Sequence, residues 1–208
     1  MKKLFLILTL LFVTACGAQE TVDLSEGKID GVAYQETSEV TNFVKIVMDN
    51  NDVILIELYP EYAPITVENF QNLVGKKFYD GTEFHRVIEG FMIQGGISAR
   101  NEQTETIVGE FPANGVDNPL LHERGVISMA RTMASMDSAS SQFFIMHQNY
   151  PSLDGEYAAF GRVIAGMDAI DRIATTEVAV NPMEGFPRPV RGQIVKSIRF
   201  VTIEQSEN

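Results

Sequence analysis

The chain contains no tryptophan, one cysteine and three histidines among its 208 residues. Because Cys16 has no second cysteine to pair with, an intrachain disulfide is excluded. His85, His122 and His147 lack the short paired spacings typical of a zinc site, so we expect no metal and no cofactor. Basic residues are also scarce, since 16 Lys and Arg stand against 28 Asp and Glu and give a formal net charge of −12. This charge argues against nucleic acid as a partner, because phosphates would be repelled.

The apolar run at the start of the chain is too short to cross a membrane. It extends from Leu4 to Val13 behind Lys2 and Lys3, and about 10 apolar residues are half of what a spanning helix needs. A basic start followed by a short apolar core is typical of a secretory signal peptide. The next residues, ending at Cys16, resemble the bacterial lipobox, in which the cysteine is lipidated and becomes the N-terminus after cleavage.

Two interpretations of Cys16 compete: an incidental residue in an ordinary secretory leader, or the acceptor of a lipid. The second is favoured because the chain has no other thiol with which an exported Cys16 could pair. We therefore predict a lipoprotein signal peptide over residues 1–15 and lipidation of Cys16. The protein would then lie at the extracytoplasmic face of a bacterial cell membrane. Acyl chains and not charge would hold it there, because cleavage removes Lys2 and Lys3 and leaves the chain more acidic.

The composition divides the remaining chain into a tether, one folded domain and a short tail. Residues 16–41 are polar, acidic and poor in large apolar residues, which is typical of a flexible acidic tether. Residues 42–203 carry the apolar patterns of a folded domain, and residues 204–208 are a C-terminal tail. Within the domain, Thr175 to Gly192 is rich in proline and glycine and predicts a surface excursion before the last strand.

The domain is predicted to be mainly β. Residues 43–48 and 53–58 are apolar runs that flank the turn Asp49 to Asp52, which is a strong hairpin signal. A helix is predicted from Ala63 to Val74, with proline in its first turn, and a second short helix should follow Gly166. Further strands are predicted at 84–88, 91–94, 126–130, 142–146, 158–163 and 194–201. About eight antiparallel strands and two helices suit a closed barrel capped by helices, although composition alone does not separate a barrel from a sandwich.

The segment Phe84 to Gly96 reads as two strands joined by a tight turn at Glu89 and Gly90. Such a hairpin brings Arg86 beside the returning strand, so that an arginine, a glutamine, a phenylalanine and a methionine share one small surface. Taken singly, each of these residues fits a structural role in a plain hairpin better than a catalytic role. Arg86 would then form a surface salt bridge. Two further runs, Gly125 to Arg131 and Ser141 to Ile145, add small and aromatic residues of the kind that line a shallow apolar groove.

These runs together resemble the cyclophilin family. Phe84 to Gly96 is similar to the family signature, and Gly125 to Arg131 and Ser141 to Ile145 are similar to two of its strands. Leu153 to Gly155 and Phe160 to Val163 match two more landmarks in the same order and spacing. The resemblance covers about Phe43 to Val201. It implies a mainly β fold, a closed eight-stranded antiparallel cyclophilin-like barrel capped by two helices, and peptidyl-prolyl cis-trans isomerase activity.

Carried over position by position, the resemblance also implies a set of site residues. The catalytic residues would be Arg86, Gln94 and Tyr157. The substrate-binding residues would be Phe91, Met92, Ala130, Arg131, Gln142, Phe144 and Leu153.

The sequence departs from the family pattern at four places. Ser152 stands where many relatives carry tryptophan, so binding of cyclosporin-type inhibitors is not implied. Tyr157 stands where many carry histidine, and its hydroxyl can still donate a hydrogen bond to a substrate carbonyl. Glu89 replaces the usual proline of the turn, and Ile97 to Gly109 lacks the family's glycine-rich loop.

The expected reaction requires no metal, nucleophile or general base. Rotation about an X–Pro bond breaks no covalent bond but meets a barrier of about 20 kcal/mol. A fixed guanidinium such as Arg86 can donate to the proline nitrogen of the twisted amide. We expect a membrane-anchored folding catalyst whose partners are proline-containing unfolded or exported polypeptides. A proline-peptide binding module or holdase is the main alternative, and an adhesin is a third possibility that rests on surface display alone.

Overall fold

The computed structural model describes residues 22–180, 182 and 185–204. The predicted signal peptide, Cys16 with residues 17–21 of the predicted tether, and residues 205–208 of the tail lie outside the described residues.

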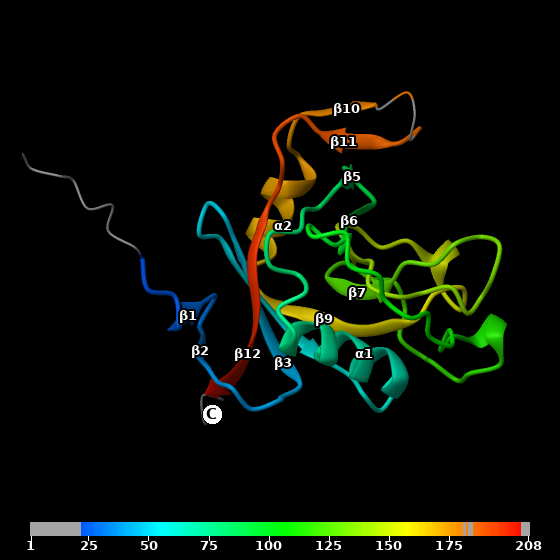
Figure 1. Cartoon of the computed structure of the whole chain (residues 1–208), viewed down its shortest axis with the longest axis horizontal. Coiled ribbons are helices and arrows are strands. Elements are labelled where there is room, and N and C mark those ends of the chain that lie inside the picture. The colour runs from blue at the N-terminus through cyan, green and yellow to red at the C-terminus, as the bar shows by residue number, and fades with distance from the viewer. Residues whose placement is uncertain (1–21, 181, 183–184, 205–208) are drawn as a thin grey trace, which may run out of the picture.

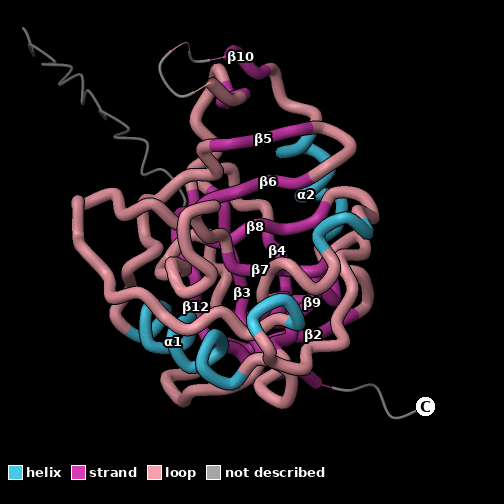
Figure 2. Tube along the Cα trace, turned by 90° about the vertical axis from the view of Figure 1, so that its right-hand side faces the viewer, coloured by secondary structure: helices cyan, strands magenta, loops and turns pink. Residues whose placement is uncertain are grey.

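Ten strands form one antiparallel sheet, in the order β1-β2-β12-β3-β4-β9-β7-β8-β6-β5. Figure 2 shows how this sheet curves so that β5, β6, β8 and β7 lie one above another. The strands are β1 (Glu26–Ile29), β2 (Val32–Glu36), β3 (Phe43–Met48), β4 (Val53–Leu58), β5 (Arg86–Ile88), β6 (Met92–Gly95), β7 (Val126–Met129), β8 (Phe143–Met146), β9 (Ala159–Ala165) and β12 (Val195–Glu204). The predicted hairpin β3–β4 and the six further strands are confirmed with small changes at their ends.

The predicted closed eight-stranded barrel is wrong, because the sheet within the described residues has ten strands and does not close. One edge of β12 pairs with β3, and residues 201–204 of the opposite edge pair with β2. On that edge, the chain before β5 contacts residues 193–195. They form an isolated bridge between Glu83 and Ile194 and hydrogen bonds such as Phe84 N–H to Gln193 O at 3.0 Å. Among the described residues this contact is an isolated bridge and not a strand ladder, so β5 and β12 do not close the sheet.

Two α-helices cover the sheet, α1 (Pro64–Gly75) and α2 (Met167–Ala174), as the sequence predicts. No side chain of the N-cap residue caps α1. Instead, the Glu110 carboxylate accepts hydrogen bonds from the Ile65 N–H at 3.0 Å and the Thr66 N–H at 2.7 Å. A carboxylate there satisfies free N–H groups and favours the positive end of the helix. Neither described helix is long and apolar enough to cross a membrane.

Within the described residues, the loops contain two short 3-10 helices and one small hairpin. Two 3-10 turns lie at η1 (Pro112–Asn114) and η2 (Pro151–Leu153), and the predicted excursion over 175–192 contains a small hairpin of β10 (Val178–Val180) and β11 (Pro187–Pro189). Figure 1 shows this hairpin above the main sheet.

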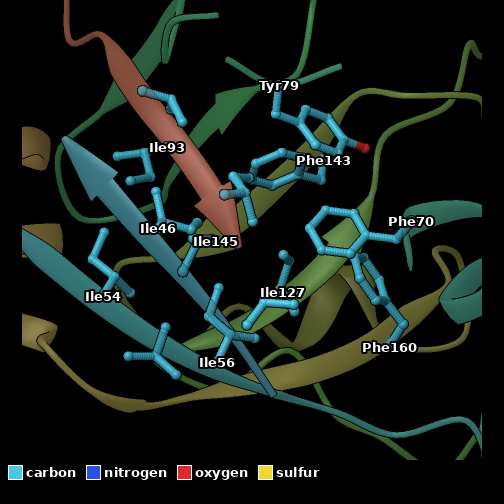
Figure 3. Close-up of a cluster of buried hydrophobic side chains, with 14 of the residues drawn as sticks. Ile46, Ile54, Ile56, Phe70, Tyr79, Ile93, Ile127, Phe143, Ile145 and Phe160 are labelled. Carbon is cyan, nitrogen blue, oxygen red and sulfur yellow. The ribbon is translucent and has the colours of Figure 1, made fainter. Parts of the chain in front are cut away.

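The core lies inside the curve of the sheet, against α1 (Figure 3). Isoleucines from β3, β4, β7 and β8 contact a group of aromatic rings. The ring centre of Phe70, in α1, lies 5.6 Å from that of Phe143 and 5.3 Å from that of Phe160. Each fully buried side chain of this size stabilises the fold by roughly 1.5–3 kcal/mol. The core therefore holds the strands that carry the site residues on their outward faces.

The prediction of a flexible tether over residues 16–41 is wrong for residues 26–36, which form the hairpin β1–β2. Its turn, Asp30–Gly31, has two consecutive positive φ angles, 49° and 87°, as tight hairpin turns require. The side chains of Leu24, Ile29 and Tyr34 pack on an apolar patch of β3, β4, β9 and β12. We call this patch the outer face, and its buried residues are Val47, Val53, Leu55, Ala165 and Val201. The hairpin covers it and so belongs to the folded domain.

The hairpin also buries Lys45, whose side chain has no exposed area. Its Nζ lies 2.6 Å from Glu36 Oε1, donates a hydrogen bond to the Leu24 carbonyl and lies 4.9 Å from the centre of the Tyr34 ring. All three partners come from residues 22–36. Because a buried charge without partners is costly, the N-terminal segment is what allows a lysine at this position of β3.

Candidate active site

Three strands bring the predicted catalytic side chains onto one face. Arg86 of β5 is paired across the sheet with Gln94 of β6, and Gln94 is paired with Phe144 of β8. Since directly paired residues of neighbouring strands point to the same side, these three side chains form a row. Arg86 Nη1 donates to Gln94 Oε1 at 3.2 Å, and Gln94 Nε2 donates to Gln142 Oε1 at 3.1 Å. Gln94 therefore holds one side of the Arg86 guanidinium, and Gln142 holds Gln94.

Arg86 is half-buried and has no carboxylate partner among the described residues. Its Cζ lies 5.9 Å from the centre of the Phe91 ring, and Nη1 lies 3.9 Å from Met92 Sδ. Burial lowers the pKa of Arg86 from its usual value, and Tyr157 opposes this shift. An arginine still carries its charge at physiological pH. The surface salt bridge that a plain hairpin would give is not formed, so N–H donors of Arg86 remain for a ligand.

A small pocket with a cavity volume of about 110 Å³ opens beside Arg86. Apolar side chains surround a few polar groups in it, as in many small-ligand sites. Tyr157 and Phe144 meet edge to face, with ring centres 5.7 Å apart. The lining residues are Arg86, Phe91, Met92, Gln94, Ala130, Arg131, Phe144, Leu153 and Tyr157. The structure thus brings together nine of the ten predicted catalytic and substrate-binding residues. The tenth, Gln142, reaches the site through Gln94, and Cys16 lies outside the described residues.

Arg131 has a different environment from the one its predicted role suggests. Its guanidinium lies between two aromatic rings, 5.2 Å from the centre of Phe111 and 4.8 Å from that of Tyr157. Nε donates to the Glu156 carbonyl at 3.0 Å and Nη1 to the Thr132 carbonyl at 3.2 Å. These donors are used inside the chain. Arg131 therefore supports Tyr157 from the side, while it also contributes to the lining of the pocket.

The structure adds His122 to the site, which the sequence interpretation missed. The side chain is buried and lies behind the pocket, with its ring stacked on Phe144 at 5.9 Å and an interplanar angle of 17°. Its two nitrogens contact Asp154 and Ser128. No sequence signal indicates this arrangement, because the contacting residues come from three separate segments.

The buried His122 makes stability depend on pH. Burial lowers the pKa of His122, and the hydrogen bond and charge of Asp154 oppose the shift. The unfolded chain binds a proton at His122 near pH 6.5, whereas the folded chain binds it only at lower pH. Stability should therefore fall as the pH falls from about 6.5 toward the lowered pKa. Urea unfolding at about pH 7.5 and 5.5 should show a steeper loss for the wild type than for His122→Gln. An equal loss in both proteins would contradict this assignment.

Comparison with known proteins places these features in one family. The family described as cyclophilin type peptidyl-prolyl cis-trans isomerase/CLD matches residues 43–198. The chain belongs to this family. The peptidyl-prolyl cis-trans isomerase of Acinetobacter baylyi is 44% identical over 135 residues, which are 62% of this chain and 71% of that protein. Peptidyl-prolyl cis-trans isomerase B of Bacillus subtilis is 40% identical over 134 residues, 63% of this chain and 90% of that protein.

Solved cyclophilin structures have a similar fold. The crystal structure of a Cryptosporidium parvum cyclophilin type isomerase matches with a TM-score of 0.63 and 27% identity, and the match covers 76% of this chain and 97% of that chain. Membership of the family makes peptidyl-prolyl cis-trans isomerisation the activity of the chain. All pocket residues lie within the matched range, whereas the hairpin β1–β2 lies outside it.

Proposed function

We propose that the pocket accelerates X–Pro bond rotation in exported polypeptides, with Arg86 donating a hydrogen bond to the proline nitrogen of the twisted amide. The observation that carries this proposal is the state of the guanidinium. It is half-buried at the edge of an apolar pocket, held on one side by Gln94 and paired with no carboxylate among the described residues. The Cryptosporidium relative was crystallised in the presence of the dipeptide Ala-Pro, which supports a proline-containing substrate here.

The chemistry needs only preferential binding of the twisted amide. In the planar amide, the nitrogen lone pair is shared with the carbonyl, which gives the bond its barrier of about 20 kcal/mol. When the bond twists, the nitrogen regains its lone pair and can accept a hydrogen bond. A donor that is available only to this state lowers the barrier without stabilising the ground state. Arg86 is fixed in place by Gln94 before substrate binds, so little reorganisation is needed.

The walls of the pocket contribute in a second way. Phe91, Met92, Phe144 and Leu153 surround the space beside Arg86, where they would hold the proline ring and exclude water. A site of low polarity favours the twisted amide, which is less polar than the planar one. Gln94 would in addition donate to the substrate backbone, and Tyr157 to a substrate carbonyl.

We propose further that a lipid on Cys16 holds the enzyme at the extracytoplasmic face of a bacterial membrane, where its clients would be exported chains. The support is the lipobox-like sequence that ends at Cys16. Because acyl chains would supply the attachment, Cys16→Ala should move the protein from the membrane fraction into the medium and abolish incorporation of labelled palmitate.

Thr14→Ser is the matched control for the anchor, since it keeps a small residue at this position and should stay in the membrane fraction with its label. Retention of Cys16→Ala at the membrane would count against lipidation.

A further inference from the structure

His122 lies behind the wall of the pocket and contacts three segments of the chain, at Asp154, Ser128 and Phe144. Its Nδ1 lies 3.1 Å from Asp154 Oδ1, in the loop that follows Leu153, and its Nε2 lies 3.1 Å from Ser128 Oγ on β7. The backbone strengthens the same connection, because the His122 N–H donates to Asp154 Oδ1 at 2.6 Å and the Tyr150 N–H donates to the His122 carbonyl at 2.9 Å. The ring is therefore held at both ends.

One tautomer of the neutral ring satisfies both partners. An ionised carboxylate only accepts hydrogen bonds, so Nδ1 carries the proton and donates to Asp154. Nε2 is then an acceptor, and the Ser128 hydroxyl donates to it. Because the two bonds leave from nearly opposite sides of the imidazole, together they fix the orientation of its plane.

This fixed plane supports two rings of the pocket. Phe144 stacks on His122 with ring centres 5.9 Å apart, and Tyr157 meets it nearly edge-on at 6.4 Å and 80°. Phe144 and Tyr157 also meet each other at 5.7 Å. His122 itself is not among the residues that line the pocket. Any effect of His122 on the reaction must therefore pass through these two rings and through the loop of Leu153.

We propose that His122 is a positioning residue of the isomerase: held between Asp154 and Ser128, it sets the orientation of Phe144 and Tyr157 against the substrate. This inference rests on the proposed function of the pocket. A displacement of about 1 Å in a positioning group can cost 10²-fold in rate. A substitution at His122 that keeps an aromatic ring but loses the hydrogen bonds to Asp154 and Ser128 should therefore lower the rate by a smaller factor.

The test compares His122→Phe with two substitutions at Asp154 in the full chain, using an Ala-Pro peptide. His122→Phe keeps a flat ring but loses both hydrogen bonds, and it should lower kcat/KM by about tenfold, mostly through kcat. Asp154→Asn keeps an acceptor oxygen for Nδ1–H and should remain within about twofold of the wild type, whereas Asp154→Ala should resemble His122→Phe. The double variant of His122→Phe and Asp154→Ala should lose little more than either single variant, because the two residues act as a unit.

A stability control separates positioning from mere support of the fold. Val53→Ala removes buried apolar contacts on the outer face, and it should lower the unfolding free energy while leaving kcat/KM within about twofold. If His122→Phe does not fold, Asp154→Ala and Asp154→Asn carry the same comparison. Wild-type rates in both His122→Phe and Asp154→Ala would overturn the proposal, as would additive losses in the double variant. An inactive wild type, or an Arg86→Ala variant as active as the wild type, would instead contradict the proposed function.

Discussion

Replacing Arg86 with alanine should lower kcat/KM for an Ala-Pro peptide at least about tenfold, with most of the loss in kcat. The substitution removes the guanidinium that Gln94 holds at the pocket, and with it the proposed donor for the twisted amide. The fold should be unaffected, since Arg86 is half-buried and makes no ion pair within the described residues. A peptide isomerisation assay, with the unfolding free energy measured beside it, tests both statements.

Arg86→Lys is the informative companion to the alanine variant. Lysine keeps the charge, but its ammonium is a single point donor and lacks the planar fork of arginine. It cannot contact Gln94 and the proline nitrogen in the same geometry, so its rate should lie between those of the wild type and Arg86→Ala. If Arg86→Ala isomerises the peptide at the wild-type rate, the arginine mechanism is wrong. If it also binds unfolded clients normally and retains full function in vivo, the holdase interpretation gains support.

Removing the negative charge of Glu36 should destabilise the fold by roughly 2–4 kcal/mol. Glu36→Gln leaves the buried Lys45 ammonium with neutral partners only, namely the new amide oxygen, the Leu24 carbonyl and the Tyr34 ring. A buried charge that has lost its counterion is costly, whereas an apolar residue of similar size in the same place is often tolerated. The combination of Glu36→Gln with Lys45→Met should therefore recover most of the lost stability. Urea unfolding of the two variants and the wild type measures this directly.

The isomerase rate supplies the control for the Glu36 series. The outer face and the hairpin β1–β2 share no residue with the lining of the pocket, so both variants should keep the wild-type kcat/KM while folded. Unchanged unfolding of Glu36→Gln would show that the Glu36–Lys45 pair does not stabilise the domain. A double variant as unstable as Glu36→Gln would show that the buried charge is not the cause.

The elements that the sequence predicts well are those specified by local signals. The hairpin β3–β4 follows from two apolar runs around a polar turn, and α1 follows from Pro64 at its start and Gly75 at its end. The hairpin β1–β2 has one local signal, the turn dipeptide Asp30–Gly31, which the tether prediction did not use. Its apolar residues are separated by polar ones, and they are buried by β3, β4 and β12, of which β12 lies more than 150 residues later in the chain. Polar composition therefore suggested a tether where the tertiary structure forms a strand pair.

In the pocket, too, short sequence runs predict some residues, whereas contacts between distant parts of the chain determine the others. Its lining residues lie in short runs that resemble the cyclophilin signature, so they could be named from the sequence. Their supports could not. His122 acquires its role from Ser128, Phe144 and Asp154, and Arg131 contacts the ring of Phe111, 20 positions before it. Glu110 similarly caps a helix that begins more than 40 residues earlier. Only the folded chain brings these groups together.

The most direct test of the central claim is exchange NMR spectroscopy of an Ala-Pro peptide at equilibrium, with the full chain present in sub-stoichiometric amount. Uncatalysed exchange takes tens of seconds, too slow to give cis–trans exchange peaks at short mixing times. We predict that the wild type produces such peaks and that Arg86→Ala, at the same concentration, loses most of their intensity. A wild-type spectrum that matches the peptide alone would contradict the assignment of isomerase activity to this pocket.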